Sequence, residues 1–279
     1  MAEALPARLL ALIHPELSRL AGQDLDPDEM LGDVMSLDSL ALVEVMLVCE
    51  DALREQAGAD LTWLVDAPVD SLSARVIAER TAERMTARLA SRSADAPTIA
   101  AELMSRVRLR PVHEPDAIWL RELMQRPSNA HQYVFRGLVG SPHRFLDLLT
   151  GDAVASFVAE LPDGSAGIGF ASVLSMDPSA GHASLGIVLT PEARDSTWAA
   201  AVFLNLADYA FTTFRLRKVY LQVPDFNIDL LSLARAHHLV AEGRMEDYHY
   251  HDGRLWGVNF VSFSVDRFTA LCGRATSDG

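Results

Sequence analysis

The apolar and polar positions of residues 1–90 repeat with the period of an α-helix. Between residues 5 and 20, apolar side chains recur three and four positions apart, which predicts an amphipathic helix. A loop containing Pro and Asp follows, and a second, strongly apolar helix is predicted over residues 39–56. Pro68 precedes a last helix that continues to residue 89. We expect an all-helical N-terminal domain, residues 1–90, of four helices, these three among them, with a long loop after the first.

The pattern changes after residue 90. Residues 90–97 carry no large apolar side chain and end in Pro97, which predicts a linker that we assign to residues 91–104. Beyond it, segments alternating with period two predict strands, and segments of helical period lie between them. The expected strands cover residues 106–112, 154–158, 167–174, 182–189, 218–223 and both sides of the turn at Asp252-Gly253, and the expected helices begin at residues 115, 196 and 230. This order predicts a multidomain chain whose second domain, residues 105–279, is α/β with a mixed central sheet.

Charge separates the two parts further. The net charge is −14, and residues 1–95 contribute −10 of it. An acidic domain argues against nucleic-acid binding and suits docking on basic patches of partner proteins, although solubility alone explains it equally well. No run of eighteen apolar residues predicts a membrane span, and the N-terminus lacks the layout of a signal peptide, so we expect a cytoplasmic protein.

The tripeptide Asp38-Ser39-Leu40 follows an acidic loop and begins the second predicted helix. This arrangement resembles the attachment site of acyl and peptidyl carrier proteins, and the helix layout of residues 1–90 is similar to that family. The resemblance implies a 4'-phosphopantetheine arm on Ser39, a phosphopantetheinyl transferase that attaches it, and an adenylating or acyl-loading enzyme that charges it. The start of a helix suits an attached phosphate. A simple helix cap at Asp38 or Ser39 is the alternative.

Several short motifs of the second domain occur in a characteristic order. They are Leu109-Arg110-Pro111 with Pro115-Asp116, the run Thr190-Pro191-Glu192-Ala193-Arg194 before a long helix ending Tyr209-Ala210-Phe211, then Asn227, Glu242-Gly243 and the hairpin Asp252-Gly253-Arg254. Over residues 105–268 their order and spacing resemble the GNAT acyltransferase superfamily, in particular the branch that acetylates protein N-termini. The resemblance implies acyl transfer from a thioester.

The resemblance also implies a coenzyme A site along the fourth strand and in the loop before the long helix. The strand residues are Ile187, Val188 and Leu189, and the loop residues are Arg194, Asp195, Ser196, Thr197, Trp198 and Ala199. The family pattern of this loop is Arg/Gln-x-x-Gly-x-Gly/Ala, whose peptide N–H groups bind the pyrophosphate. Here Thr197 replaces a glycine and Asp195 adds a negative charge. Either the loop belongs to a working coenzyme A or acetyl-CoA enzyme, or the donor is carried on Ser39, or the domain binds without catalysis.

Candidate catalytic residues lie on the same strand and farther along. Ser184 occupies the position where the resembled branch often has an acidic residue, and His182 shares its strand face, so His182 is a candidate base. A structural His is the alternative. Asn227 matches an asparagine that the family places near the pantetheine, and Tyr248 is a candidate proton donor to the leaving thiolate. His249 and His251 share a face without a third ligand, so no metal site is expected.

Residues 128–136, a mixture of polar and aromatic side chains, lie where the resembled family shapes its acceptor pocket, although a plain surface loop fits them equally well. The sequence therefore predicts a carrier–acyltransferase didomain of specialised metabolism. It would transfer an acyl or aminoacyl thioester from Ser39 to a small-molecule amine. Two alternatives remain: acetyl-CoA acylates a substrate tethered to Ser39, or the second domain only presents the carrier to partner enzymes.

Overall fold

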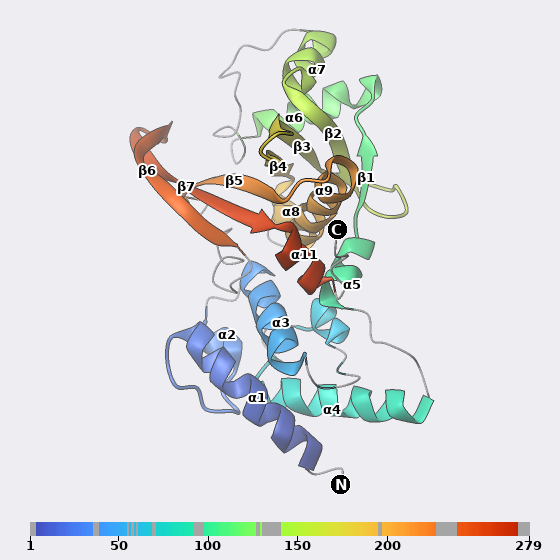
Figure 1. Ribbon diagram of the computed structural model, residues 1–279, viewed down its shortest axis with the longest axis vertical. Coiled ribbons are helices and arrows are strands. Elements are labelled where there is room, and N and C mark those ends of the chain that lie inside the picture. The colour runs from blue at the N-terminus through green and yellow to red at the C-terminus, as the bar shows by residue number, and fades with distance from the viewer. Residues whose placement is uncertain are drawn as a thin grey trace.

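The computed structural model describes residues 4–35, 39–54, 56, 59, 61–68, 71–91, 98–126, 129, 141–194, 197–226 and 239–272. No helix within these ranges is long and apolar enough to cross a membrane. The elements form a helical N-terminal part below and a sheet flanked by helices above (Figure 1).

Three long helices dominate the N-terminal part. They are α1 (Ala4–Ala21), α3 (Ser39–Leu53) and α4 (Ala74–Ser91), and the short α2 (Leu31–Val34) and the 3₁₀ turn η1 (Thr62–Asp66) complete this part. The predicted four-helix carrier bundle is therefore not shown. The last predicted helix begins at Ala74 because the carbonyl of Leu72 accepts the Leu31 N–H, which fixes the preceding segment in a non-helical conformation against α2.

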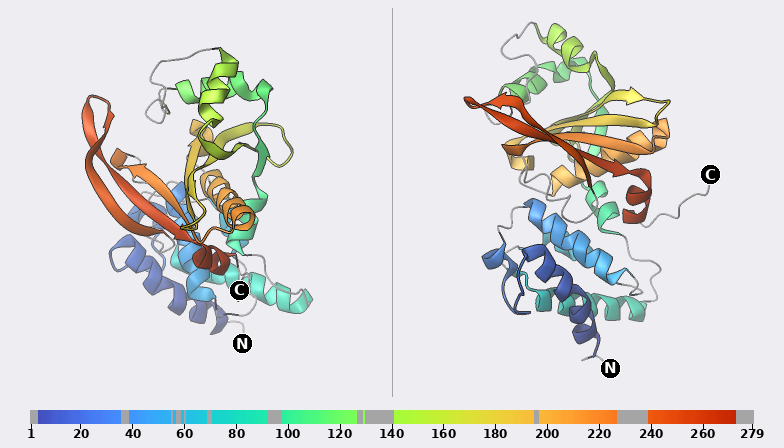
Figure 2. Two further views of the ribbon diagram at one scale, coloured as in Figure 1. Left: turned by 45° about the horizontal axis from the view of Figure 1, so that its top comes forward. Right: turned by 60° about the vertical axis from the view of Figure 1, so that its left-hand side comes forward.

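Helix α3 is buried on every side between residues 41 and 49. The exposed fraction of each of these nine residues is 9% or less, and Glu44 and Cys49 are among them. A helix that is apolar all round is stable only inside a structure. Helices α1 and α4 cover one side of α3, and the second part of the chain covers the other, so α3 is a central layer of the molecule (Figure 2).

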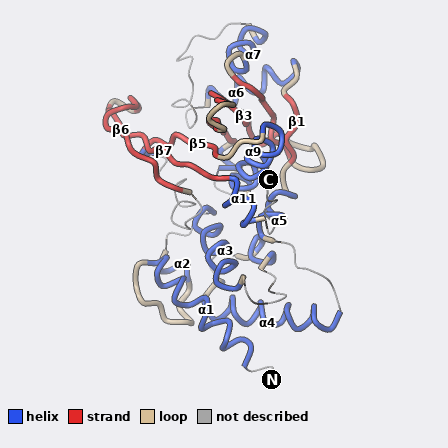
Figure 3. The backbone as a smooth tube through the Cα atoms, viewed as in Figure 1, coloured by secondary structure: helices blue, strands red, loops and turns tan. Residues whose placement is uncertain are grey.

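A seven-stranded mixed sheet, ordered β1-β2-β3-β4-β5-β7-β6, forms the second part (Figure 3). Its strands are β1 (Arg108–Pro111), β2 (Ala153–Glu160), β3 (Gly167–Asp177), β4 (His182–Leu189), β5 (Lys218–Pro224), β6 (Val240–His251) and β7 (Arg254–Ser264). All neighbouring pairs are antiparallel except β4 and β5, which are parallel. The predicted mixed sheet is confirmed.

Helices cover both faces of this sheet. Helices α6 (Ala117–Gln125) and α7 (Pro142–Thr150) pack on one face through a small apolar cluster that includes Phe145, Phe170 and Val188. The long α9 (Trp198–Phe214) covers the other face, with α8 (Pro191–Arg194) before it and α11 (Val265–Leu271) beside it. Helix α9 thus lies between the sheet and α3 (Figure 2).

The predicted linker is partly helical. Residues 99–105 form α5 (Ile99–Ser105), whose Ile99, Ala100 and Leu103 side chains are buried. Glu50 of α3 accepts the Ile99 N–H at 2.9 Å, and Asn205 of α9 donates to the carbonyls of Met104 and Val107. Helix α5 is therefore a packed junction between the helical part and α9.

Candidate functional site

Strands β4 and β5 are paired only where they begin. His182, Ala183 and Ser184 lie opposite Lys218, Val219 and Tyr220, and beyond Ser184 the described strands have no further pairing. Each strand continues along its other neighbour, β4 with β3 to Leu189 and β5 with β7 to Pro224. The two strands therefore diverge and leave a gap in the middle of the sheet that widens toward their C-terminal ends.

Peptide groups of β4 point into this gap. The Thr190 N–H donates to Ile168 on β3 at 2.9 Å, so alternate residues of β4 direct their N–H and C=O groups to β3. The residues between them, Leu185, Ile187 and Leu189, consequently direct theirs toward β5, where the partner strand has moved away. An extended molecule with amide groups fits such a strand edge.

The β5 side of the gap is tied to β7 and β6 through Asp225. Its carboxylate accepts the Asn259 Nδ2–H at 2.9 Å, the Gly257 N–H at 3.1 Å and the Arg244 Nε–H at 3.1 Å. The Arg244 guanidinium, through its hydrogen bonds, holds the pKa of Asp225 below its usual value, although partial burial opposes this shift. Asp225 therefore ties the end of β5 to β6 and β7, on the side opposite β4.

The β4 side of the gap is tied to α6 through Asn129, which is fully buried. Its Nδ2 donates to the carbonyls of Leu123 at 3.0 Å and Leu189 at 3.1 Å. Its Oδ1 accepts a hydrogen bond from Nη2 of Arg194. Asn129 thus connects the end of α6, the last residue of β4 and the last residue of α8.

Ser184 lies at the apex of the gap, as the last residue of β4 that pairs with β5. Directly opposite is Tyr220, which the sequence analysis did not select. The His182 ring contacts the Tyr220 ring edge to face, with 5.4 Å between centroids, and Nζ of Lys218 lies 5.6 Å from the Tyr220 ring centroid. Ala183 and Leu185 face α9 in the main core, so His182 and Ser184 share the opposite face.

The other predicted site residues have different outcomes. Tyr248 lies on β6 with 58% of its surface exposed, and β5 and β7 separate it from β4, so the structure does not bring it to Ser184. Asn227, Asp195 and Ser196 lie outside the described residues, as does most of the predicted acceptor segment 128–136. Within that segment Asn129 is described.

The predicted donor-site residues are close to the mouth of the gap. The backbone of Ile187 faces the gap, whereas Val188 directs its backbone to β3 and its side chain toward α6 and α7. Thr197 precedes α9 without a side-chain cap, Trp198 is half-buried, and the Ala199 side chain is buried in the core. Helix α8 links the end of β4 to the start of α9 and contacts both elements, so the N-terminal end of α9 lies near the wide end of the gap.

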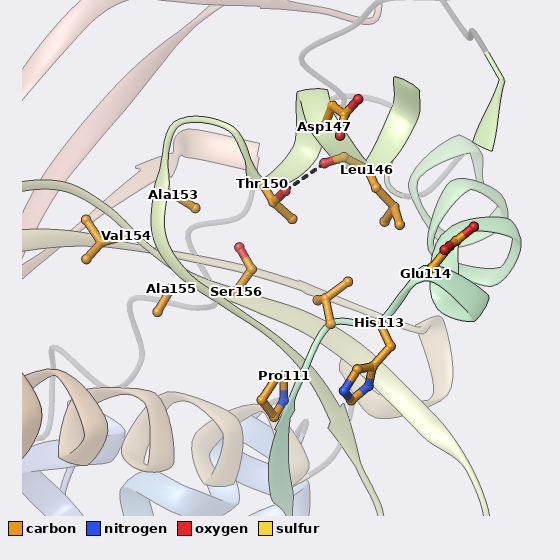
Figure 4. Close-up of a pocket in the computed structure, with 11 residues that line it drawn as sticks. Pro111, His113, Glu114, Leu146, Asp147, Thr150, Ala153, Val154, Ala155 and Ser156 are labelled. Atoms are coloured by element: carbon orange, nitrogen blue, oxygen red, sulfur yellow. Dashed lines mark hydrogen bonds between the residues drawn. The ribbon is translucent and has the colours of Figure 1, made fainter. Parts of the chain in front are cut away.

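A hollow that does not border the gap lies between the end of β1, the end of α7 and the start of β2 (Figure 4). Its volume is about 420 Å³, and the Ser156 hydroxyl points into it. Ser156 pairs with Ser172 on β3, and Ser172 pairs with Gly186 on β4. Two strand spacings, roughly 10 Å, therefore separate this hollow from the strand that borders the gap.

Ser39 is the first residue of α3, and residues 36–38 lie outside the described residues. One turn farther along α3, Val43 and Leu47 share a small enclosed apolar space with Ala200 and Phe203 of α9. In the right-hand view of Figure 2, the chain enters α3 from α2 at the end that lies nearest the start of α9. The first turn of α3 is thus on the same side of the molecule as the wide end of the gap.

Residues 106–239 match the family described as acetyltransferase (GNAT) domain. Spermidine N-acetyltransferase from Vibrio cholerae in complex with CoA and spermine is similar to the second part of this chain, with 23% identity and a TM-score of 0.52 over 59% of this chain and 98% of that one. A chimera of the V. cholerae enzyme and hSSAT gives 21% identity and a TM-score of 0.51 over 58% and 98%. No curated protein sequence matches the chain.

The similar structures confirm the fold of the second part, and the match to the acetyltransferase (GNAT) family supports N-acyltransferase activity. The matched residues begin at 106, after the helical part. The family match does not extend to residues 1–90, for which the carrier resemblance was predicted.

Proposed function

We propose that the GNAT domain transfers an acyl group from a pantetheine thioester to a small-molecule amine in the gap between β4 and β5. The observation that carries this proposal is the divergence of the two strands after Ser184, which turns peptide groups of Leu185 and Ile187 toward an open slot. Pantetheine contains two amide groups and is extended, so it can pair with this strand edge as a peptide does.

The apex of the gap supplies the polar groups for transfer. The amine must be neutral to attack the thioester carbonyl, and the thiolate that leaves must receive a proton. Ser184 and Tyr220 lie opposite each other at the narrow end, where an inserted thioester stops. In our proposal their hydroxyls contact the carbonyl and the sulfur, and His182, on the same strand face, accepts the proton of the amine.

The wide end of the gap suits the phosphate end of the donor. Helix α9 is 17 residues long, and its first N–H groups and its dipole favour an anion there. Arg194 adds a guanidinium one turn earlier. Because Thr197 stands where the family has glycine, we propose that the phosphates contact Arg194 and the first turn of α9 more than the backbone of this loop.

The acceptor class follows from the same chemistry. The similar solved structures are spermidine N-acetyltransferases, one of them in complex with spermine. From these proteins we take over only the type of group that reacts, and we propose a primary aliphatic amine as the acceptor.

A thiol-release assay tests this proposal. The purified protein is mixed with acetyl-CoA and longer acyl-CoA donors, with putrescine, spermidine or simple alkylamines as acceptors. We expect Ser184→Ala to lower kcat on the order of ten-fold, and the matched control Ser156→Ala, two strands away, to leave it unchanged. No thiol release with any pair, or equal loss in both variants, contradicts the proposal and favours a domain that only binds.

A second candidate keeps Ser39 as the donor site. The position of the first turn of α3 near the wide end of the gap favours a phosphopantetheine arm that enters the GNAT domain of its own chain, as part of a carrier–acyltransferase of specialised metabolism. The flanks of α3 are buried, so loading enzymes would approach its N-terminal end only. Intact-mass analysis after incubation with a phosphopantetheinyl transferase and CoA tests it. Addition to the wild type but not to Ser39→Ala is expected, and no addition to the wild type excludes a carrier role.

A further inference from the structure

Asn129 is a buried polar side chain that joins helix α6 to the end of β4 and to Arg194, next to the proposed donor site. It follows α6, the helix that packs on the face carrying His182 and Ser184, and it is fully buried. Leu189 and Arg194, its partners, belong to the donor side. An amide with three hydrogen bonds in a buried position specifies a single arrangement of its partners, because each lost bond leaves a buried polar group unsatisfied.

The bond to Leu189 has a specific position. The carbonyl of Leu189 belongs to the set of β4 peptide groups that point toward the gap, and Asn129 occupies it at 3.1 Å. The edge of β4 that remains open to a ligand therefore ends before Leu189, at the level of Ile187. Asn129 occupies the strand edge at the wide end of the gap. In the proposed complex the pantetheine therefore pairs with β4 only as far as Ile187, and the phosphates of the donor lie beyond that point.

The bond to Arg194 sets the direction of the only cation of α8. The Oδ1 of Asn129 accepts from one guanidinium nitrogen, which leaves the other N–H groups of the planar fork in a fixed orientation. Helix α8, which ends at Arg194, is a short turn in which the Ala193 and Arg194 N–H groups both donate to the Thr190 carbonyl, each at 3.0 Å. Asn129 thus holds this turn against α6.

We infer that Asn129 is a positioning residue of the donor site. It orients Arg194 toward the phosphates and couples the turn at residues 190–194 to the end of α6. The inference rests on the proposed function for the identity of the ligand. Its structural part, the restraint of the turn at residues 190–194 by Asn129, stands without a ligand.

The test compares CoA binding by calorimetry in the wild type, Asn129→Ala, Arg194→Ala and the double variant. Asn205→Ala is the matched control, because Asn205 also donates from a half-buried amide to backbone carbonyls, those of Met104, Val107 and Ala201, far from the gap. We expect Asn129→Ala and Arg194→Ala each to weaken CoA binding on the order of ten-fold and the double variant to be no weaker than the worse single variant. Asn205→Ala should bind CoA as the wild type does. The inference is overturned if the loss of CoA affinity in the double variant equals the product of the two single losses. It is also overturned if Asn129→Ala binds CoA as tightly as the wild type does.

Hydrogen exchange without ligand separates this inference from the proposed function. In Asn129→Ala the amides of Ala193 and Arg194 should exchange at least several-fold faster than in the wild type and in Asn205→Ala. If the wild type binds no CoA but this acceleration is seen, the proposed donor fails and the restraint stands. Unchanged exchange at both amides rejects the restraint, whatever the ligand. Asn129→Gln, which retains an amide, serves for both measurements if Asn129→Ala does not fold.

Discussion

The junction between α3 and α5 makes the stability of the whole protein depend on pH through Glu50. Its carboxylate lies near the end of α3, is partly buried, and accepts the Ile99 N–H that begins α5. Burial raises the pKa of Glu50 from its ordinary value of 4.5 to about 7, with a smaller contribution in the same direction from Asp51. The Ile99 hydrogen bond and Arg54 oppose this shift.

The sign of the effect follows from proton binding. Between pH 4.5 and about 7 the folded state holds a proton on Glu50 that the unfolded state has released, so the free energy of unfolding decreases as the pH rises through this range. A shift of this size corresponds to at most about 3 kcal/mol, since one pKa unit is worth about 1.4 kcal/mol. The substitution Glu50→Gln retains an oxygen that accepts the Ile99 N–H and removes the charge.

We therefore expect Glu50→Gln to match the wild type at pH 4.5 and to exceed its free energy of unfolding by about 2 kcal/mol at pH 8. Urea unfolding followed by tryptophan fluorescence, at four pH values from 4.5 to 8, measures this difference. Glu83→Gln is the control. Glu83 lies exposed on α4, so its replacement should leave the free energy of unfolding unchanged at both low and high pH. Parallel pH profiles for the wild type and Glu50→Gln would refute the reasoning, because they would mean that Glu50 is charged in the folded state at low pH.

Three further results are expected from other parts of the structure. Leu47→Ala should lower the free energy of unfolding by about 2–5 kcal/mol, since Leu47 is buried against α9, and a single urea transition seen by both far-UV circular dichroism and fluorescence would show that the two parts unfold together. Tyr220→Phe should lower kcat on the order of a hundred-fold with little change in the KM for the acyl donor, as steady-state kinetics can show; a change in KM alone would place Tyr220 outside proton transfer. Asp225→Asn should weaken CoA binding, which calorimetry measures. It should also reduce the loss of stability at acid pH, which acid titration measures. The lowered pKa of Asp225 stabilises the folded state at pH values above its usual titration range, and this stabilisation is lost as the pH falls.

Local pattern predicted much of the second domain. The strand over residues 182–189 and the hairpin turn at Asp252-Gly253 occur where alternation and turn residues placed them, with positive φ angles of 50° and 78° at the turn. These features depend on neighbours in sequence. Helix α5 was missed because its short apolar face, Ile99 with Leu103, follows a stretch of polar and small residues typical of a linker.

The gap and its polar ties were less accessible to sequence reasoning. Asn129 bonds to residues 60 and 65 positions away, and Asp225 bonds to Asn259 across 34 positions. A single polar residue in a loop carries no signal of such partners. Tyr220 likewise becomes a candidate only through its register with Ser184. One signal was present and was not used: the nearly unbroken apolar run from Leu40 to Cys49 is typical of a helix buried on both sides, and a carrier helix exposed to partners would not need it.

The two-sided burial of α3 also has a consequence for synthesis on the ribosome. Helix α3 ends at Leu53, but α9, which covers one of its sides, ends at Phe214, so most of the chain is made before that cover exists. During this interval Val43 and Leu47 lack their contacts with α9. The nascent helical part is then an aggregation-prone intermediate, which needs chaperones or rapid synthesis and folding of the sheet domain. An isolated fragment of residues 1–91 would keep this apolar side exposed permanently.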